Sequence, residues 1–525
     1  MSEDLRHECG IAALYWLNKP AGSQGPASRL VQNGDVVPLL PGVLLDLQNR
    51  GQLAGGVSSY NPNRASLIQT FKDIGTVSEA FRMSHPSKHA AILQRLSGPA
   101  AIGHTRYATC GVDLVSHAQP FERHHGRRWK WFAFAFNGQL ANYAALRQAL
   151  LARQHYHCTQ NTDTEIIMHQ LSYRLRGDKR PDLPAVMKSL ARQFDGAYNL
   201  AFIDAMGDMF IARDALGFRP LCWGVQGRLF AAASESVALA NLGFSDIRHL
   251  EPGMMAVVRK GRLSFVRFAP CRREAHCFFE WVYFANVASV IDGTSVYVSR
   301  SRAGQRLAEL EDQPIGDDCI VVPVPDTAKA AADAFAFRLG VPSVEGLIRN
   351  RYVGRTFILG SDTRQVSARR KYTPLPAVLA GKRVFLVEDS IVRSTTLAAL
   401  ADQIRRRGGA REVHVRVACP PIVSPCFYGI DMSTLGELFA PRFVGRGFRG
   451  ALDDRTAARM AKALGVHSLR YLTVPDMEQC IRIGSERLCL GCVMGQYPTP
   501  WGDIHLRRAK RKFRDGAETA RTYES

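Results

Sequence analysis

Two adjacent carboxylates and the hydroxyl-rich turn that follows them are the side chains best suited to chemistry in this sequence. Residues 383–396 read RVFLVEDSIVRSTT, in which a short apolar run ends at Glu388 and Asp389. Carboxylates accept hydrogen bonds from a sugar diol, and the free N–H groups at a helix start hold a phosphate. The segment therefore predicts a buried strand, a turn and a helix that together bind a phosphorylated sugar. An ordinary strand–turn–helix with a capping box is the alternative.

A second candidate is Cys9, which lies just before the apolar run IAALYWL at 11–17. Hydrolysis of an amide needs a nucleophile, a proton acceptor and an oxyanion site. A cysteine at a mature N-terminus carries its own base, because the ordinary pKa of an α-amino group is about 7.7–8.0. A buried structural cysteine is the alternative at this position.

A third candidate is the CxxC formed by Cys489 and Cys492, which by itself fits a redox pair, a zinc site or chance. The chain has 12 cysteines. Because its N-terminus, MSEDLRHECG, lacks the apolar core of an export signal, we expect a cytoplasmic protein without a disulfide framework. The cysteines are then available for a nucleophile and a metal or cluster site.

Composition places the chain among globular proteins of two or more domains. It has 525 residues, of which 46% are hydrophobic and 22% charged. No apolar stretch approaches the roughly 20 residues that span a membrane. The net charge of +21 fits either nucleic acid or anionic substrates. The densest basic cluster is RRAKRKFR at 507–514, which we expect to be solvated rather than to bind nucleic acid.

The elements that must position these residues differ between the two halves of the chain. Residues 9–265 contain short β-like runs separated by Gly and Asp turns, with helical patterns such as 142–154 and 163–175 between them. This predicts an α+β unit with antiparallel sheets. Residues 266–500 alternate strand-like and helical segments, which predicts an α/β unit with a parallel sheet. Residues 501–525 form a basic tail.

Several strings of the first half occur in an order that resembles the glutaminase domain of N-terminal-nucleophile (class II) amidotransferases. They are Cys9, LQNRGQ at 47–52, GHTRYATCG at 103–111, FNGQLANY at 136–143 and TDTE at 162–165. The resemblance implies an αββα sandwich and removal of residues 1–8 as a leader that exposes Cys9.

The same resemblance implies roles for four more residues. Arg106 binds the glutamine α-carboxylate and Asp163 its α-ammonium, while Asn137 and the backbone N–H of Gly138 form the oxyanion hole. A tight turn is the alternative for Asn137-Gly138, since Asn-Gly is a strong turn dipeptide.

The segment 383–396 resembles the phosphoribosylpyrophosphate (PRPP) motif of type I phosphoribosyltransferases. A class II glutaminase followed by this motif resembles the amidophosphoribosyltransferase family, over Cys9 to about Pro498. The resemblance implies transfer of ammonia from glutamine to PRPP, the first committed step of de novo purine biosynthesis. It implies Mg²⁺ held by Thr327, Glu388 and Asp389. The expected PRPP-binding residues are Glu388, Asp389, Ser390, Arg393, Ser394, Thr395, Thr396 and Arg349.

Some positions depart from the family pattern. Glu388 replaces an aspartate, Ser394 a glycine and Arg349 a lysine, while Asn49 and Leu53 replace a histidine and a glutamate. A position that required positive φ would make Ser394 costly. The alternative is therefore a catalytically weak PRPP-binding regulatory paralogue. The loop NRYVGRTFI at 350–358 is expected to close over PRPP and exclude water.

The resemblance also implies a [4Fe–4S] cluster that pins the C-terminal segment to the core. Four thiolates suit a cluster or zinc, and the resemblance favours the cluster. The expected ligands are Cys277, Cys426, Cys489 and Cys492. Expected partners are glutamine, PRPP, purine nucleotide inhibitors and further copies of the chain in a homodimer or homotetramer. The GxGxxG at 445–450 is not taken as a nucleotide site because no clear strand precedes it.

Overall fold

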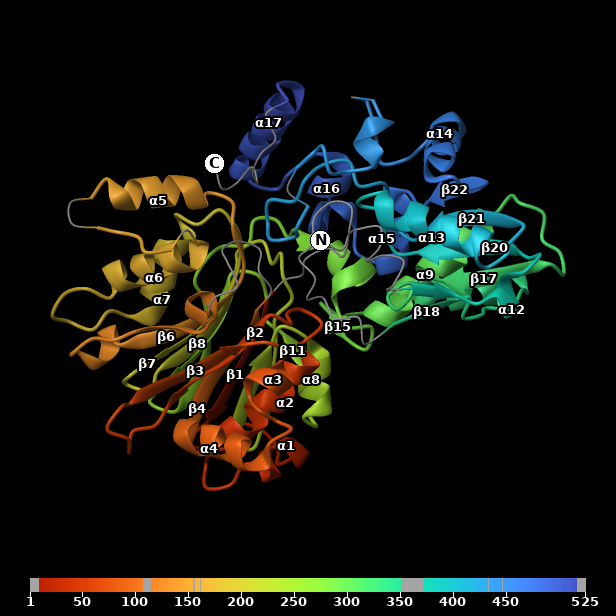
Figure 1. The fold of residues 1–525 in the computed structure, drawn as a ribbon. Coiled ribbons are helices and arrows are strands. Elements are labelled where there is room, and N and C mark those ends of the chain that lie inside the picture. Colours follow the sequence, from red (N-terminus) through yellow and green to blue (C-terminus); the bar gives the residue numbers. More distant parts are fainter. Residues whose placement is uncertain are drawn as a thin grey trace.

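The structure is a computed structural model that describes residues 9–106, 115–153, 156–160, 162–350, 372–432, 434–445 and 447–516. The expected leader 1–8 and tail end 517–525 lie outside the described residues, as do residues 351–358 of the expected lid and Cys110. Two parts lie side by side, one built on antiparallel sheets and one on a parallel sheet (Figure 1).

The first antiparallel sheet has seven strands in the order β11-β9-β10-β1-β4-β2-β3. In β1, alternate side chains face two different cores: Ala12 and Leu14 on one side, Ile11, Ala13 and Tyr15 on the other. The strands are β1 (Gly10–Trp16), β2 (Ala54–Tyr60), β3 (Ile68–Ile74), β4 (Ala100–Arg106), β9 (Cys222–Gln226), β10 (Leu229–Ala233) and β11 (Arg248–His249).

The second antiparallel sheet has six strands in the order β13-β12-β8-β7-β6-β5. In β6, Ala133 and Ala135 face the core shared with the first sheet, while Phe132, Phe134 and Phe136 face outward. The strands are β5 (Phe121–Arg123), β6 (Phe132–Leu140), β7 (Gly196–Asp204), β8 (Met209–Arg213), β12 (Met254–Arg259) and β13 (Arg262–Arg267).

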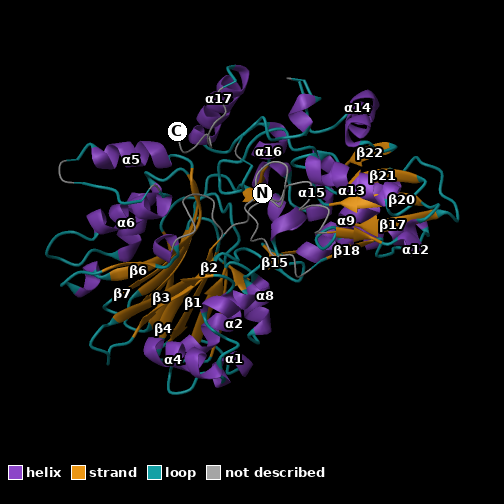
Figure 2. Cartoon of the chain, viewed as in Figure 1, coloured by secondary structure: helices purple, strands orange, loops and turns teal. Residues whose placement is uncertain are grey.

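Helices cover the outer face of each sheet, which gives four layers (Figure 2). Over the first sheet lie α1 (Pro26–Arg29), α2 (Leu40–Asp46), α3 (Val77–Ala80), α4 (Pro86–Leu96) and α8 (Ser236–Asn241). Over the second lie α5 (Tyr143–Leu151), α6 (Asp163–Arg174) and α7 (Leu183–Ala191). The expected αββα sandwich is confirmed.

The second half is built on four parallel strands in the order β17-β20-β21-β22, which confirms the expected α/β unit. Residues 384–387 of β20 are fully buried, as in a sheet covered on both faces. The strands are β17 (Cys319–Pro323), β20 (Arg383–Glu388), β21 (Glu412–Val417) and β22 (Ser468–Tyr471). The helices are α9 (Val296–Glu309), α10 (Lys329–Leu339), α12 (Pro376–Leu379), α13 (Thr395–Arg406), α14 (Asp454–Leu464) and α15 (Val474–Ile481).

Short elements complete the described chain. Three two-stranded pairs join β14 (His276–Cys277) to β23 (Leu488–Cys489), β15 (Val290–Ile291) to β16 (Thr294–Ser295) and β18 (Leu347–Arg349) to β19 (Tyr372–Pro374). The helical turns are η1 (Val37–Leu39), η2 (Val115–His117), η3 (Arg128–Lys130), η4 (Glu280–Phe284), η5 (Ala440–Arg442), η6 (Ser485–Arg487) and α16 (Gly491–Met494).

The basic segment near the C-terminus folds as the helix α17 (Pro500–Arg514). One face is buried through Gly502, His505, Leu506 and Ala509, and His505 Nε2 donates to the carbonyl oxygen of Ala141 over 2.6 Å. The helix is therefore packed on one side and solvated on the other.

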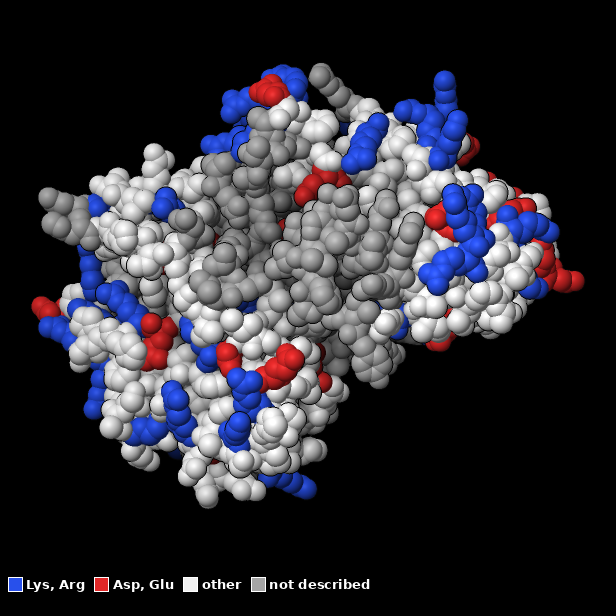
Figure 3. Space-filling model, viewed as in Figure 1, with Lys and Arg blue, Asp and Glu red and all other residues white. Residues whose placement is uncertain are grey.

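Lys and Arg side chains are scattered over both halves on the face that Figure 3 shows, with some gathered on α17. The high net charge therefore does not form one continuous band on this face. A search of the described residues finds no helix with the length and apolar character needed to cross a membrane.

Candidate active sites

The first candidate site lies where β1 begins, in the middle of the seven-stranded sheet. Cys9 is half-buried and directly precedes this strand. The backbone N–H of Gly10 donates to Thr105 Oγ1 over 3.2 Å, and β4 lies alongside in the register Gly10↔Thr105. The cysteine thus lies directly before a central, buried strand.

The Asn137-Gly138 pair lies in β6 of the other sheet, close to the start of β1. Asn137 is fully buried, and its Nδ2 donates to Ser234 Oγ over 3.3 Å. The same Ser234 Oγ accepts from the backbone N–H of Ile11 over 3.0 Å. Gly138 has φ +150°, and a Cβ there would lie 2.0 Å from the Ala197 carbonyl oxygen. The pair belongs to a strand rather than to an isolated tight turn.

The two predicted glutamine-binding residues reach the same end of the sandwich. Asp163 begins α6, and its Oδ2 accepts from the backbone N–H of Leu140 over 3.3 Å, two residues after Gly138. Arg106 ends β4 and is 5% exposed. Burial, with the charge of Arg106 as a further cause, lowers the pKa of His104 to about 3, so that His104 is neutral. A basic and an acidic side chain thus lie where β4 ends and where α6 begins.

The second candidate site lies at the carboxyl end of β20. Asp389 is 4% exposed, accepts from Ser390 Oγ over 2.6 Å and is bound by the Thr327 hydroxyl. Helix α13 then begins at Thr395 after Ser394, whose φ is −85°. Because this conformation suits any residue, the strain that a positive φ would cause at Ser394 does not arise. The strand, acidic pair, turn and helix predicted from the sequence are all present.

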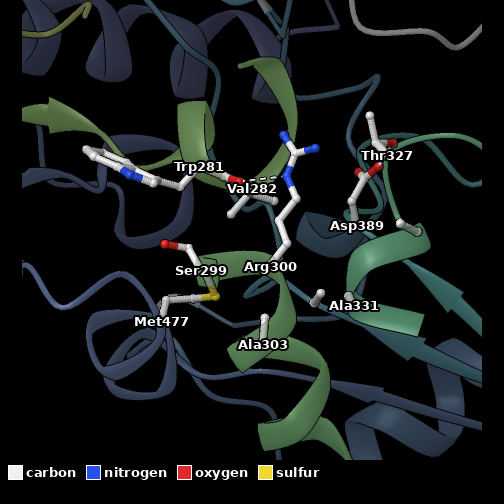
Figure 4. A pocket seen from close by; sticks show the side chains of 11 residues that line it. Trp281, Val282, Ser299, Arg300, Ala303, Thr327, Ala331, Asp389 and Met477 are labelled. Atoms are coloured by element: carbon white, nitrogen blue, oxygen red, sulfur yellow. Dashed lines mark hydrogen bonds between the residues drawn. The ribbon is translucent and has the colours of Figure 1, made fainter. Parts of the chain in front are cut away.

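A small pocket lies beside Asp389 and Thr327 (Figure 4). Arg300 of α9 lines this pocket. Its Nε donates to the carbonyl oxygen of Trp281 over 2.8 Å, and its NH2 group donates to the carbonyl oxygen of Ala285 over 2.9 Å. Burial lowers the pKa of Arg300, and the charge of Asp389 opposes that shift. Sequence reasoning missed Arg300, because its importance depends on its contact with a segment 15 to 19 residues away.

Two predicted phosphate-binding cations are paired with carboxylates. Arg349 donates to Asp326 Oδ2 over 2.6 Å, and Arg393 donates to Glu437 Oε2 over 3.0 Å. The pair β18–β19 brings Arg349 and Tyr372 together on either side of residues 351–371. An incoming phosphate would compete with these carboxylates for the two cations.

The four predicted cluster ligands line one small cavity. Cys277 and Cys489 are partners in the short β14–β23 ladder, and Cys492 follows one turn later. Burial raises the pKa of the Cys277 thiol to about 11 and that of the Cys426 thiol above its ordinary value. No group of three or more His, Cys, Asp or Glu among the described residues is placed to hold a single metal ion, at this cavity or at Asp389.

A buried ionic network joins the two halves between these sites. Arg50 pairs with Glu235 and with Glu280, each over 2.6 Å, and Arg219 lies 3.5 Å from Glu280. Asn49, one of the departures from the family pattern, donates to Glu235 over 2.7 Å and to the Phe284 carbonyl oxygen over 3.1 Å. The strings LQNRGQ and SES at 234–236 contain these residues, but the sequence did not show that they meet Glu280.

Comparisons with known proteins agree with this geometry. Residues 104–241 match the family model described as a glutamine amidotransferase domain. The amidophosphoribosyltransferase of Methanothermobacter thermautotrophicus is 37% identical over 503 residues, which cover 95% of this chain and 96% of that protein. The chain belongs to the amidophosphoribosyltransferase family. The Methanocaldococcus jannaschii relative is 38% identical over 87% of this chain and 93% of its own length.

Solved structures extend the amidophosphoribosyltransferase likeness to three dimensions. The glutamine PRPP amidotransferase from B. subtilis, solved with ADP and GMP, has a TM-score of 0.76 and 30% identity and covers 94% of this chain and 98% of its own. A structure titled as the allosteric regulatory enzyme of purine biosynthesis has a TM-score of 0.77 and 30% identity and covers 94% and 96%. The chain thus shares the two-part fold of its relatives. As a member of this family, the protein is a glycosyltransferase with glutamine amidotransferase activity.

Proposed function

We propose that the chain hydrolyses glutamine in its first half and transfers the ammonia to PRPP in its second half. The products are glutamate, pyrophosphate and 5-phosphoribosylamine. The observation that carries this proposal is that one molecule of the amidophosphoribosyltransferase family contains two separate groups of candidate site residues. One is built around Cys9 and Asn137, and the other around Asp389 at the end of β20.

The roles in the first half follow from charge and position. Cys9 attacks the side-chain amide carbon of glutamine after the leader 1–8 is removed, and its own α-amino group accepts the proton. The second N–H of Asn137 Nδ2 and the backbone N–H of Gly138 stabilise the oxyanion. The cation of Arg106 holds the α-carboxylate of glutamine, and the carboxylate of Asp163 holds its α-ammonium. The C–N bond then breaks, ammonia leaves, and a Cys9 thioester remains. Water hydrolyses this thioester, which releases glutamate and the free thiol.

The roles in the second half follow from the strand–turn–helix. Glu388 and Asp389 accept hydrogen bonds from the ribose hydroxyls, and Arg349 contacts the pyrophosphate. Mg²⁺ usually binds through one or two carboxylates together with substrate phosphates. Thr327, Glu388 and Asp389 offer oxygen atoms of this kind, so these residues fit the ion together with PRPP. The 5′-phosphate lies on the turn and helix start formed by Ser390, Arg393, Ser394, Thr395 and Thr396.

We infer that the cysteine cavity holds an iron–sulfur cluster. Four thiolates also suit zinc, and the family resemblance is what favours the cluster. Four thiols around one cavity supply the Cys₄ donor set of a [4Fe–4S] cluster. Cys277, Cys426, Cys489 and Cys492 would hold it, which would tie residues 488–492 to the loop 426–431.

Further parts of the proposal concern organisation. We place the glutaminase unit at 9–265, the phosphoribosyltransferase unit at 266–500 and a basic C-terminal segment at 501–525. A cytoplasmic location fits a chain whose cysteines are expected to supply a nucleophile and a cluster site rather than a disulfide framework. Purine nucleotides are proposed as inhibitors because the B. subtilis relative was solved with ADP and GMP. We propose a homodimer or homotetramer as the assembly.

The first experiment measures release of glutamate and pyrophosphate by anaerobically purified protein. PRPP, Mg²⁺ and glutamine are supplied together or singly. Coupled release of both products supports the proposal. Release of glutamate without pyrophosphate would instead support the regulatory paralogue with a silent second site.

The variant Cys9→Ala separates the two half-reactions. It should lose glutamine-dependent synthesis and retain synthesis with ammonium salts. The matched control is Cys158→Ala, a half-buried cysteine outside both sites, which should retain both activities. Loss of ammonia-dependent synthesis in a folded Cys9→Ala protein would contradict the two-site arrangement.

A further inference from the structure

Ser234 connects the nucleophile strand to the oxyanion strand. It follows β10, is fully buried, and its backbone N–H donates to the Ile11 carbonyl oxygen over 2.9 Å. Its Oγ accepts from the backbone N–H of Ile11 over 3.0 Å and from Asn137 Nδ2 over 3.3 Å. A single hydroxyl oxygen therefore ties the strand that begins after Cys9 to the side-chain amide of Asn137, across the two sheets of the sandwich.

The amide of Asn137 depends on this contact for its orientation. Among the described residues, Asn137 Oδ1 has no hydrogen-bond partner, so it does not hold the amide plane. Nδ2 carries two N–H groups, and Ser234 engages one of them. The other is then directed by the plane that Ser234 fixes. An oxyanion donor must be aligned before the charge develops, because realignment during the reaction costs activation free energy.

We propose that Ser234 is a positioning residue for the glutaminase reaction, which sets the Asn137 amide relative to Cys9. This inference rests on the proposed function, since it needs Asn137 to act as an oxyanion donor. Ser234 does not touch the substrate in this proposal; it acts through Asn137.

The test compares Ser234→Ala with the unaltered enzyme. We expect kcat for glutamine hydrolysis to fall about 10-fold with little change in KM, less than the 100- to 1000-fold typical of losing an oxyanion donor. Ammonia-dependent synthesis should be unchanged. If the unaltered enzyme itself released no glutamate, the proposed function would fail; if Ser234→Ala matched an active parent, only this inference would fail.

A matched control lies two residues away. Ser236 is also buried, and its Oγ accepts from the backbone N–H of Val290 over 2.8 Å, but it has no contact with Asn137. Ser236→Ala removes the same kind of hydrogen bond from the same segment and should leave kcat for glutamine within about 2-fold. An equal fall in both variants would overturn the proposal, because the effect would then be structural.

A double-mutant cycle provides the decisive measurement. Because Ser234 acts through Asn137, Ser234→Ala should lower kcat by less than about 2-fold when Asn137 is already alanine. A full additive loss in that background would overturn the proposal, as would loss of ammonia-dependent synthesis in the single variant. The variant Ser234→Thr keeps the Oγ and should regain most of kcat.

Discussion

Arg50 and Glu280 form an ion pair in the interior, although 230 positions separate them in the sequence. Arg50 NH2 and Glu280 Oε2 lie 2.6 Å apart, and both side chains are almost completely excluded from solvent. Arg50 follows helix α2 of the four-layer sandwich, and Glu280 begins the turn η4 near the start of the second half. Since Arg50 also pairs with Glu235 and Arg219 lies 3.5 Å from Glu280, two guanidinium groups face two buried carboxylates at the junction.

Replacing Arg50 should destabilise the protein strongly. Arg50→Met leaves Glu235 and Glu280 buried with less compensation, which typically costs about 3–5 kcal/mol. The measurement is the unfolding midpoint in denaturant. Arg82→Met is the matched control, because Arg82 makes an exposed pair with Asp73 and should change stability by less than about 1 kcal/mol. Similar midpoints for the two variants would contradict the structural importance assigned to this network.

Acid should weaken the four-layer sandwich through His104. Burial, first, and the charge of Arg106 lower the pKa of His104 from 6.5 to about 3. In the unfolded chain, the His104 imidazole therefore binds a proton below about pH 6.5. In the folded chain, it remains neutral until about pH 3. The free energy of unfolding is therefore unaffected by His104 above about pH 6.5. It decreases as the pH falls from there toward about pH 3, by up to about 1.4 kcal/mol per pH unit.

The variant His104→Gln tests this dependence. As the pH is lowered from 7 to 4, the melting temperature should fall less steeply for His104→Gln than for the parent. The two slopes are compared, so a constant difference in melting temperature between the proteins does not matter. His124→Gln is the control, because the His124 side chain is 74% exposed. Parallel curves for His104→Gln and the parent would show that His104 is not the group responsible.

The cysteine cavity should lose its cluster when one ligand is removed. Cys426→Ser, purified anaerobically, should contain much less iron and acid-labile sulfide than the parent and melt at a lower temperature, because the cluster would tie residues 488–492 to the core. Cys480→Ser is the control: Cys480 is buried on α15 away from the cavity, and burial raises its pKa to about 12. Zinc without iron in the parent would contradict the proposed occupant.

Asp389 should determine PRPP affinity without affecting glutamine hydrolysis. Two hydroxyls, from Thr327 and Ser390, donate to its carboxylate. Asp389→Asn weakens charge-assisted hydrogen bonds worth about 1.5–3 kcal/mol, so the KM for PRPP should rise about 10- to 100-fold in ammonia-dependent synthesis. The control is Asp402→Asn on α13, an exposed pair with Arg406. A normal KM for PRPP in Asp389→Asn would exclude Asp389 from the ribose site.

Local patterns predicted the elements well where hydrophobic periodicity is strong. The fully apolar 384–387 became the buried strand β20, and the helix predicted at 163–175 is α6 at Asp163–Arg174. The sequence left open whether the position of Ser394 needs a positive φ, and the structure gives it an ordinary helical conformation. Backbone conformation at a turn depends on how the next helix packs, which local sequence does not specify.

The sequence by itself predicted on which kind of element each candidate residue lies, because motif composition and hydrophobic spacing are local properties. Asp389 was predicted from its strand–turn–helix motif, whereas Cys9 and Asn137 were predicted from an ordered set of strings that resembles a known family. Only the tertiary structure decided that Ser234 joins the Cys9 strand to Asn137, that Arg50 meets Glu280, and that Arg300 lines the pocket beside Asp389. Such contacts join residues far apart in the chain, and only the burial of apolar faces between layers brings them within hydrogen-bond distance.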